Sequence, residues 1–439
     1  MKLADIIDTF ITGDWGEESP TQDTPNAAYC VRGADIVPIT NHNFTDIPQR
    51  YICDRTKETK LLAAGDLVIE KSGGSPTQST GRIVYVSEDL IKAKGNVVCS
   101  NFCTAFRVKA GWNPLYVYYF WQNVYNHGAF FNFEGKTSGI KNLQLDNALS
   151  AIDIEYLPLE KQNQIVASLA SIDEKIKVNR QINDNLEAMA RQLYDYWFVQ
   201  FDFPNEDGKP YKSSGGAMVW NEELHINIPY SWNTCLLNDY IGSNNTGDWG
   251  FDEPAEKRNM KVGCIRGADI VKLNDLPTRY IKDSNTSKLL SVWDIVIEVS
   301  GGSPTQATGR SAFVTPGVLK RNGGNLTCSN FCHAFTMKNY KASAYFFFMW
   351  RMFYDNNNMF NYEGKTSGIK NFMTDTFLAN KWLDVPTALL DLFFERIKVI
   401  YEQIDNNIEE INALTKQRDE LLPLLMNGQA TVNYHLSDD

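Results

Sequence analysis

The sequence has no long uninterrupted hydrophobic run. The nearest approach extends from Ala344 to Trp350 and stops at Arg351, which is far short of the roughly 20 apolar residues that a membrane-spanning helix needs. The amino terminus, MKLADIIDTF, has acidic residues where a signal peptide would have its apolar segment. We therefore expect a cytoplasmic protein without a membrane partner.

Basic residues are also fewer than acidic residues. The chain has 42 Lys and Arg against 53 Asp and Glu, a net charge of −11, which argues against a protein whose whole surface grips nucleic acid. The charge is segregated, however. Residues 53–142 contain eleven basic and seven acidic residues, residues 281–371 ten and five, and residues 386–428 four and eight. The two middle stretches are locally basic, and ordinary mixed surface charge is the alternative interpretation.

The motifs of catalysis and cofactor binding are missing. The sequence has no GxxxxGK[ST] phosphate loop, no glycine-rich cofactor fingerprint and no Pro-Pro motif of an amino-methyltransferase, and none of its five histidines recurs between the two halves. Asp66, Glu70 and Lys71 are reminiscent of a nuclease metal site, but the spacing is wrong and Val299 replaces Lys71 in the second half. We expect no catalytic residue and no cofactor.

The eight cysteines do not form an obvious framework. Without an export signal they are predicted to be reduced thiols. The pentapeptide CSNFC occurs at Cys99–Cys103 and at Cys328–Cys332, but no second Cys or His pair recurs with it. Because residues four apart share one face of a strand, we expect these cysteines to be small buried side chains. No metal site is predicted.

What the sequence does contain is a long internal repeat. Five motifs recur in the same order at an offset of 228 to 234 residues, so one whole domain has been duplicated. Besides CSNFC, the pairs are TGDWG at Thr12–Gly16 and Thr246–Gly250, RGADIV at Arg32–Val37 and Arg266–Val271, SGGSPTQSTGR at Ser72–Arg82 and SGGSPTQATGR at Ser300–Arg310, and EGKTSGIKN at Glu134–Asn142 and Glu363–Asn371.

Each copy has the pattern of predicted strands and helices that is typical of a mixed α/β domain. The segments Asp66–Glu70, Arg82–Val86 and Val97–Val108 are predicted as strands, because they are rich in Val, Ile, Phe and Cys and are bounded by Gly or Ser. The aromatic stretches Leu115–Tyr125 and Ala344–Tyr354 are long enough for helices. We expect two compact domains of roughly 150 residues each.

A heptad pattern follows each copy. Mostly apolar residues alternate in steps of three and four from Ile165 to Trp197, and again from Phe393 to Leu425, 228 residues later. Such seams predict two long helices that pair as an antiparallel coiled coil. Packing of each helix on its own domain is the alternative. Asn179 and Asn407 occupy equivalent seam positions, where a buried Asn fixes the register of a coiled coil.

These observations predict a fixed order of domains along the chain. The segment after the first helix, rich in Gly, Pro, Lys and Ser, is typical of a connecting loop. The predicted parts are a first domain at 1–157, a central long helix at 158–200, a linker at 201–227, a second domain at 228–385, a C-terminal long helix at 386–428 and a tail at 429–439.

Over essentially its full length the chain resembles the specificity subunits of type I restriction-modification systems. The resemblance rests on Leu157-Pro158-Leu159 before EKQNQIV, on QFDFPNEDGKPYKSSGG followed by NEEL and IPYSW, and on LLPLLMNGQ at the end of the second helix. The chain departs from the family pattern where the first helix begins with LPLEKQ instead of a doubled proline, and where the second begins with VPTALL and lacks the Gln.

The resemblance implies two target-recognition domains that each read one half of a split double-stranded DNA site. It also implies that the paired helices act as a ruler and as the docking surface for two methyltransferase subunits, with catalysis in those partners and in the restriction and translocase subunits. About forty helical residues extend over roughly 60 Å, enough to hold two domains one or two DNA turns apart.

The repeated loops supply the candidate DNA-binding residues. Gln can pair with adenine and Arg with guanine or phosphate, while a Gly-flanked Lys-Thr-Ser cluster suits phosphate contacts. Tight turns that close strands are the alternative interpretation of the glycines. The candidates are Trp15, Thr77, Gln78, Arg82, Lys136, Thr137, Ser138 and Lys141 in the first copy, and Trp249, Thr305, Gln306, Arg310, Lys365, Thr366, Ser367 and Lys370 in the second.

Identical motifs do not distinguish one half-site from the other. They are either scaffold and phosphate contacts, or both domains read the same bases, and we predict a nearly palindromic bipartite target. A duplicated protein-binding or carbohydrate-binding scaffold is the rival function. Such a scaffold would share the repeat and the helices but would show no salt-dependent affinity for DNA.

Overall fold

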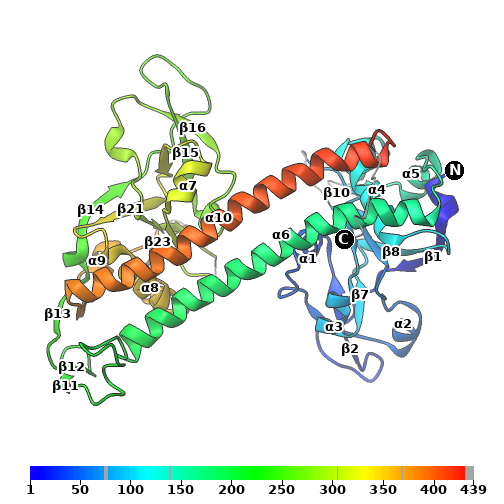
Figure 1. The fold of residues 1–439 in the computed structure, drawn as a ribbon. Helices are drawn as coiled ribbons and strands as arrows, with labels where there is room; N and C mark the ends of the chain where they lie inside the picture. The colour runs from blue at the N-terminus through cyan, green and yellow to red at the C-terminus, as the bar shows by residue number, and fades with distance from the viewer. Residues whose placement is uncertain (74–77, 138–139, 304, 367–368, 431–439) are drawn as a thin grey trace, which may run out of the picture. The chain divides into compact units, whose positions relative to one another are not determined.

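The computed structural model describes all residues except 74–77, 138–139, 304, 367–368 and 431–439. The chain divides into two compact units (Figure 1). Unit 1 comprises Met1–Val178 and Ile411–Asp439, and unit 2 comprises Asn179–Glu410. Each unit therefore contains one copy of the repeat together with part of each long helix.

The core of unit 1 is a four-stranded antiparallel sheet in the order β1-β8-β4-β6. Its central strand β4 is buried at all four positions, which explains its continuous apolar run. The helix α4 (Pro114–Asn126) covers one face of this sheet with its aromatic side chains. The four strands are β1 (Ile7–Thr12), β8 (Cys103–Val108), β4 (Leu67–Glu70) and β6 (Ile83–Tyr85).

Two three-stranded sheets flank this core. One has the order β3-β2-β7 and the other β5-β10-β9. Their strands are β2 (Asn26–Val31), β3 (Gln49–Ile52), β7 (Val97–Cys99), β5 (Ser72–Gly73), β9 (Glu134–Thr137) and β10 (Ile140–Leu143). The short helices are α1 (Ile36–Thr40), α2 (Asp54–Thr59), α3 (Glu88–Lys94) and α5 (Leu145–Ala151), with 3-10 turns η1 (Leu3–Ile6), η2 (Gly33–Asp35) and η3 (Ala129–Phe133).

Unit 2 repeats this architecture strand for strand. Its sheets have the orders β14-β21-β17-β19, β16-β15-β20 and β18-β23-β22. The strands are β14 (Ile241–Thr246), β15 (Met260–Ile265), β16 (Thr278–Ile281), β17 (Ile295–Glu298), β18 (Ser300–Gly301), β19 (Ser311–Phe313), β20 (Leu326–Cys328), β21 (Cys332–Met337), β22 (Glu363–Thr366) and β23 (Ile369–Phe372). The helices are α7 (Pro316–Arg321), α8 (Ala342–Asp355) and α9 (Thr374–Leu378), with 3-10 turns η5 (Leu237–Tyr240), η6 (Gly267–Asp269), η7 (Thr286–Lys288) and η8 (Asn358–Tyr362).

The segment predicted as a linker contributes ordered structure to unit 2. Strand β11 (Met218–Asn221) pairs with β12 (Ile226–Pro229). Phe203 stacks on Trp232 with ring centroids 5.1 Å apart. A further pair, β13 (Asn233–Leu236) with β24 (Lys381–Asp384), joins the beginning and the end of the second domain.

The two long helices are α6 (Leu159–Tyr194) and α10 (Thr387–Met426), and a π-helical turn, η4 (Asp195–Val199), follows α6. In unit 2, Asn407 donates a hydrogen bond to the Asn183 amide oxygen at 2.7 Å. In unit 1, Arg418 forms an ion pair with Asp173 at 3.0 Å. Within unit 2, Asn179 of α6 donates to Glu410 of α10, so contacts that move forward along α10 move backward along α6 and the helices are antiparallel. The predicted fold class, two tandem α/β domains each followed by a long helix, is confirmed.

Each long helix also packs on the domain within its own unit. In unit 1, Lys177 forms an ion pair with Asp89 of α3 at 2.9 Å. In unit 2, Asp405 accepts a hydrogen bond from the Gly317 N–H of α7 at 2.8 Å. Pairing of the helices and packing on the domains, which the sequence presents as alternatives, therefore occur together.

The prediction of one strand over Val97–Val108 is wrong. The segment forms two strands, β7 and β8, which belong to different sheets. A turn separates them, closed by a hydrogen bond from the Cys103 N–H to the Ser100 carbonyl at 2.9 Å. Cys99 and Cys103 are buried as expected, with 1% and 0% exposed. They are buried because a tight turn returns the chain into the core, and strand alternation is not the reason.

Candidate nucleic-acid interface

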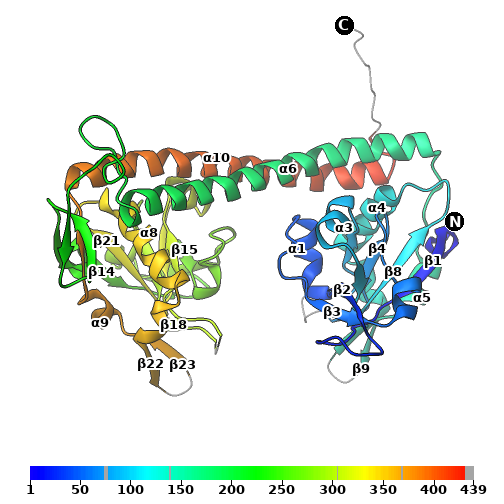
Figure 2. The ribbon, with the colours of Figure 1, turned by 90° about the horizontal axis from the view of Figure 1, so that it is seen from below.

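The five repeated motifs converge within each unit. In unit 2 the hairpin of β22 and β23 lies at the end of the domain away from the long helices, and in unit 1 β9 has the corresponding place (Figure 2). Two backbone hydrogen bonds connect the CSNFC turn to the start of the SGGSPTQ segment, from the Lys71 and Ser72 N–H groups to the Phe102 carbonyl at 2.8 and 3.1 Å. These two motifs, which are far apart in the sequence, are thus adjacent in the fold.

The SGG strand is tied to the EGKTSGIKN hairpin. Strand β5 pairs with β10, placing Ser72 opposite Asn142. The Ser72 hydroxyl donates a hydrogen bond to the Asn142 amide oxygen at 2.5 Å. Ser300 and Asn371 repeat this contact at 2.5 Å. The identical residues of the two motifs are therefore needed to hold them together.

A buried glutamate and an arginine form the centre of each cluster. The Arg82 Nε and Nη2 donate to the Glu70 carboxylate at 2.8 and 2.6 Å, and Arg310 contacts Glu298 with the same geometry at 2.8 and 2.6 Å. Only 4% and 3% of the glutamate side chains are exposed. Hydrogen bonding to Glu70 raises the pKa of Arg82. Bidentate pairs of this kind fix geometry as well as charge.

The same carboxylate determines where glycine is required. A Cβ on Gly33 of the RGADIV motif would lie 2.5 Å from the Glu70 Oε1, and a Cβ on Gly73 would lie 2.6 Å from it. Gly267 and Gly301 have the corresponding contacts at 2.7 and 2.6 Å. The RGADIV and SGG loops thus approach the buried carboxylate as closely as a backbone allows.

Lysine and glutamate close the hairpin of each copy. The Lys141 ammonium lies 3.0 Å from the Glu134 carboxylate, and Lys370 lies 2.9 Å from Glu363. Glu134 also accepts a hydrogen bond from the Thr80 N–H at 2.7 Å. Burial raises the pKa of Glu134, but the Thr80 N–H and the Lys141 ammonium together outweigh it, and the net pKa is lowered.

The TGDWG loop packs directly on the CSNFC turn. The Asp14 N–H donates to the Cys99 carbonyl at 2.7 Å, and a Cβ on Gly13 would overlap the Ser100 carbonyl oxygen. The loop therefore needs glycine at this position.

The tryptophans of the two TGDWG loops are each covered by an arginine. The Arg50 guanidinium lies 4.1 Å from the centre of the Trp15 ring. The Arg279 guanidinium lies 4.3 Å from the centre of the Trp249 ring. Cation–π stacking of this kind orders both side chains.

Apart from the two tryptophans, the predicted DNA-binding residues fall into four groups in the structure. Gln78, Thr305 and Gln306 are exposed, whereas the arginines and lysines described above are committed to ion pairs within the domain. Lys136 and Thr137 belong to β9, and Lys365 and Thr366 belong to β22. Thr77, Ser138 and Ser367 lie outside the described residues.

The two seam asparagines have different surroundings. Asn407 is 5% exposed and contacts Asn183 across the helix pair. Asn179 is partly exposed and donates to the Glu410 carboxylate at 2.9 Å. Equivalent heptad positions are thus not equivalent in burial.

Sequence reasoning missed the acidic residues that organise the site. Glu134 and Glu363 belong to motifs in which only the basic and hydroxyl residues are predicted to bind DNA. Glu70 is considered in the sequence only as a metal ligand. It also missed Phe102 and Phe331, which are 57% and 56% exposed between buried cysteines. The available signal was the identity of these residues in both copies.

Within the part of the chain that the structure describes, no three His, Cys, Asp or Glu residues are grouped so as to hold a metal ion. No helix among the described residues is long and apolar enough to cross a membrane. Burial raises the pKa of Cys103 and of Cys332 to about 11, so these thiols are protonated at neutral pH.

Comparisons with known proteins agree with the sequence motifs. The family model of the type I restriction modification DNA specificity domain matches residues 2–188. The specificity subunit of the type I restriction enzyme MjaIX from Methanocaldococcus jannaschii is 26% identical over 298 residues, which are 65% of this chain and 62% of that protein. The specificity subunit of HindI from Haemophilus influenzae is 36% identical over 56 residues, 13% of this chain and 12% of that protein.

The chain thus spans less than two thirds of the length of both relatives. A crystal structure of a type I restriction-modification S subunit from M. genitalium covers 99% of this chain and 96% of its own, with 13% identity and a TM-score of 0.47.

Proposed function

We propose that this chain is a specificity subunit of a type I restriction-modification system, which the family model and the curated relatives support. It recognises a bipartite double-stranded DNA target and carries no catalytic residue of its own. The first domain, 1–157, and the second, 228–385, each read one half-site. The observation that carries this proposal is that the same five motifs contact one another within each domain.

The chemistry of the converged loops supports contact with DNA. Each cluster presents exposed amide and hydroxyl groups, Gln78 in the first copy and Thr305 and Gln306 in the second. An amide side chain matches the donor and acceptor pattern of adenine in the major groove. Lys136 and Lys365, with the neighbouring Thr and Ser residues, are assigned to phosphates. Arg82 and Arg310 hold the loops in place through their glutamates.

The target is proposed to be nearly palindromic. Much of the identity between the copies is explained by contacts inside each cluster, such as the Glu70–Arg82 pair. Contacts of this kind carry no information about bases. Gln78 and Gln306 are exposed and identical in the two copies, and equal side chains at equal positions favour equal bases in the two half-sites.

The long helices are assigned to assembly. Two methyltransferase subunits and the restriction and translocase subunits supply catalysis, and α6 and α10 provide their docking surface and set the spacing of the half-sites. Asn179 and Asn407 fix the register of the helix pair, because each contacts a residue of the opposite helix and a misaligned pairing would break both hydrogen bonds.

The decisive test is sequencing of methylated bases in cells that express this chain with its cognate methyltransferase. The comparison is with cells that lack only this chain. A split motif with a fixed gap, methylated only when the chain is present, is the expected result, and unrelated half-sequences would contradict the palindrome. Unchanged methylation by an assembled complex would contradict the DNA-reading function.

The rival protein-binding or carbohydrate-binding scaffold is tested by the salt dependence of DNA binding. A DNA-reading complex loses affinity in proportion to the number of phosphates it contacts, so log K falls linearly with log salt concentration. Absence of any salt-dependent affinity for duplex DNA would favour the scaffold.

A further inference from the structure

The CSNFC turn places an aromatic ring in solvent at the same position of both copies. Phe102 is 57% and Phe331 56% exposed. The cysteines on either side, Cys99 and Cys103, are 1% and 0% exposed. A ring left in water between two core residues loses the stabilisation that burial of a large apolar side chain provides.

The backbone holds this ring in a defined place. The Phe102 carbonyl accepts hydrogen bonds from Lys71 and Ser72, and the Phe331 carbonyl accepts them from Val299 and Ser300 at 2.8 and 3.1 Å. The ring is therefore carried by a fixed turn beside the SGGSPTQ segment. The backbone that carries the ring is therefore already ordered in the free protein, which lowers the entropy cost of binding.

Exposed aromatic residues elsewhere are not all retained in the second copy. Phe10 in β1 is 47% exposed, and its counterpart in the repeat is Asn244. Phe102 and Phe331 lie in a pentapeptide that is identical in both copies. Their ring does not contribute to the core, so core packing does not account for its retention.

We propose that Phe102 and Phe331 press against the apolar surface of nucleobases in the two half-sites. This inference rests on the proposed function and deepens it, because it adds an apolar base contact to loops that otherwise offer polar groups. A phenylalanine ring meets DNA bases in two known ways, by contact with the thymine methyl group or as a wedge at a base step. Both present the same apolar chemistry to the ring.

The test uses the full chain assembled with its cognate methyltransferase subunits. The probes are a fluorescent duplex carrying the methylated motif and a duplex with scrambled half-sites. Phe102→Ala and Phe331→Ala are each expected to lower affinity for the specific duplex by about tenfold or more, as loss of one base contact does. The slope of log K against log salt should stay unchanged, since no phosphate contact is lost.

Phe10→Ala is the matched control, an exposed phenylalanine outside the repeated motifs, and is expected to bind like the wild type. Phe102→Leu keeps an apolar side chain and should retain part of the affinity. Thermal melts of all variants verify that the exposed substitutions leave the fold intact. Replacement of thymine by uracil identifies a methyl contact, and 2-aminopurine fluorescence identifies an opened base step.

Failure of the proposed function and failure of this inference alone give different experimental results. If the wild-type complex does not prefer the specific duplex, the proposed function fails, and this inference fails with it. If the wild type shows that preference and both alanine variants bind equally well with folded domains, the inference alone is refuted. A reduced salt slope in the alanine variants would also refute it, because it would indicate loss of phosphate contacts.

Discussion

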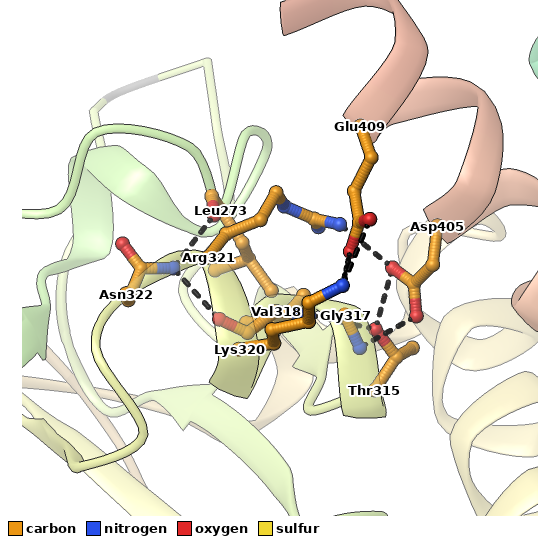
Figure 3. A network of polar contacts seen from close by, with 9 residues as sticks. All are labelled: Leu273, Thr315, Gly317, Val318, Lys320, Arg321, Asn322, Asp405 and Glu409. Carbon is orange, nitrogen blue, oxygen red and sulfur yellow. Dashed lines mark hydrogen bonds and ion pairs between the residues drawn. The ribbon is translucent and has the colours of Figure 1, made fainter. Parts of the chain in front are cut away.

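Asp405 is the residue whose loss should most clearly separate α10 from the second domain. The residue is 7% exposed, and its carboxylate accepts hydrogen bonds from the Thr315 hydroxyl at 2.9 Å, the Gly317 N–H at 2.8 Å and the Arg321 Nη1 at 3.0 Å (Figure 3). A Cβ on Gly317 would overlap the carboxylate. One anion from the long helix thus caps the amino terminus of α7 and neutralises a buried arginine.

Asp405→Ala is expected to destabilise unit 2 by about 3–5 kcal/mol. Removing one partner of a buried ion pair leaves the other charge uncompensated, which costs on this order, and the loss of the cap on α7 contributes roughly 1 kcal/mol within that range. Only 10% of each side chain in the Arg321–Asp405 pair is exposed, so solvent does little to screen the arginine.

The assay is urea denaturation of the full chain, with hydrogen exchange of α7 as a local probe. Lys320→Ala is the matched control, because the Lys320–Glu409 pair joins the same two helices but is 71% and 38% exposed. Its loss should cost less than about 1 kcal/mol. If Asp405→Ala unfolds within 1 kcal/mol of the wild type, or exchange in α7 is unchanged, the reasoning is refuted.

The remaining predictions concern the motif cluster and the thiols. Glu70→Gln is expected to destabilise unit 1 by about 3 kcal/mol in denaturant melts, because Arg82 loses a buried anion; an unchanged midpoint would contradict this. Cys53, whose pKa is lowered by a hydrogen bond from a neighbouring threonine, should be alkylated before Cys103 and Cys332, as mass spectrometry will show; the reverse order would contradict it. Because burial raises the pKa of Cys103 and of Cys332 from 9.0 to about 11, the unfolded state loses these protons first, and the free energy of unfolding should fall as pH rises from 9 to 11.

The sequence was sufficient for features that depend on local patterns. Self-similarity showed the duplication because identical motifs recur in order, and the heptad steps that end at Trp197 and Leu425 showed the long helices. The aromatic helices α4 and α8 were predictable from length and composition. Each of these signals is contained within one segment of chain.

The partners of charged side chains were not predictable in this way. Arg82 and Lys141 resemble DNA-binding residues in sequence, yet both pair with glutamates inside the domain. Pairing depends on which loops meet after folding, and spacing along the chain does not specify this. The turn that separates β7 from β8 is a similar case, since Val, Cys and Phe on both sides favour an uninterrupted strand.

The docking of the long helices shows most clearly what only the tertiary structure decided. Equivalent heptad positions carry Lys177 and Asp405, opposite charges in a repeat that is otherwise closely matched. Lys177 contacts Asp89 of α3, whereas Asp405 contacts the amino terminus of α7, where Gly317 stands in place of Asp89. The sequence determined that two such helices exist. Only tertiary packing decided which contact attaches each helix to its domain. The groups that the folded domain brings close to the helix determine whether that contact is an ion pair or a helix cap.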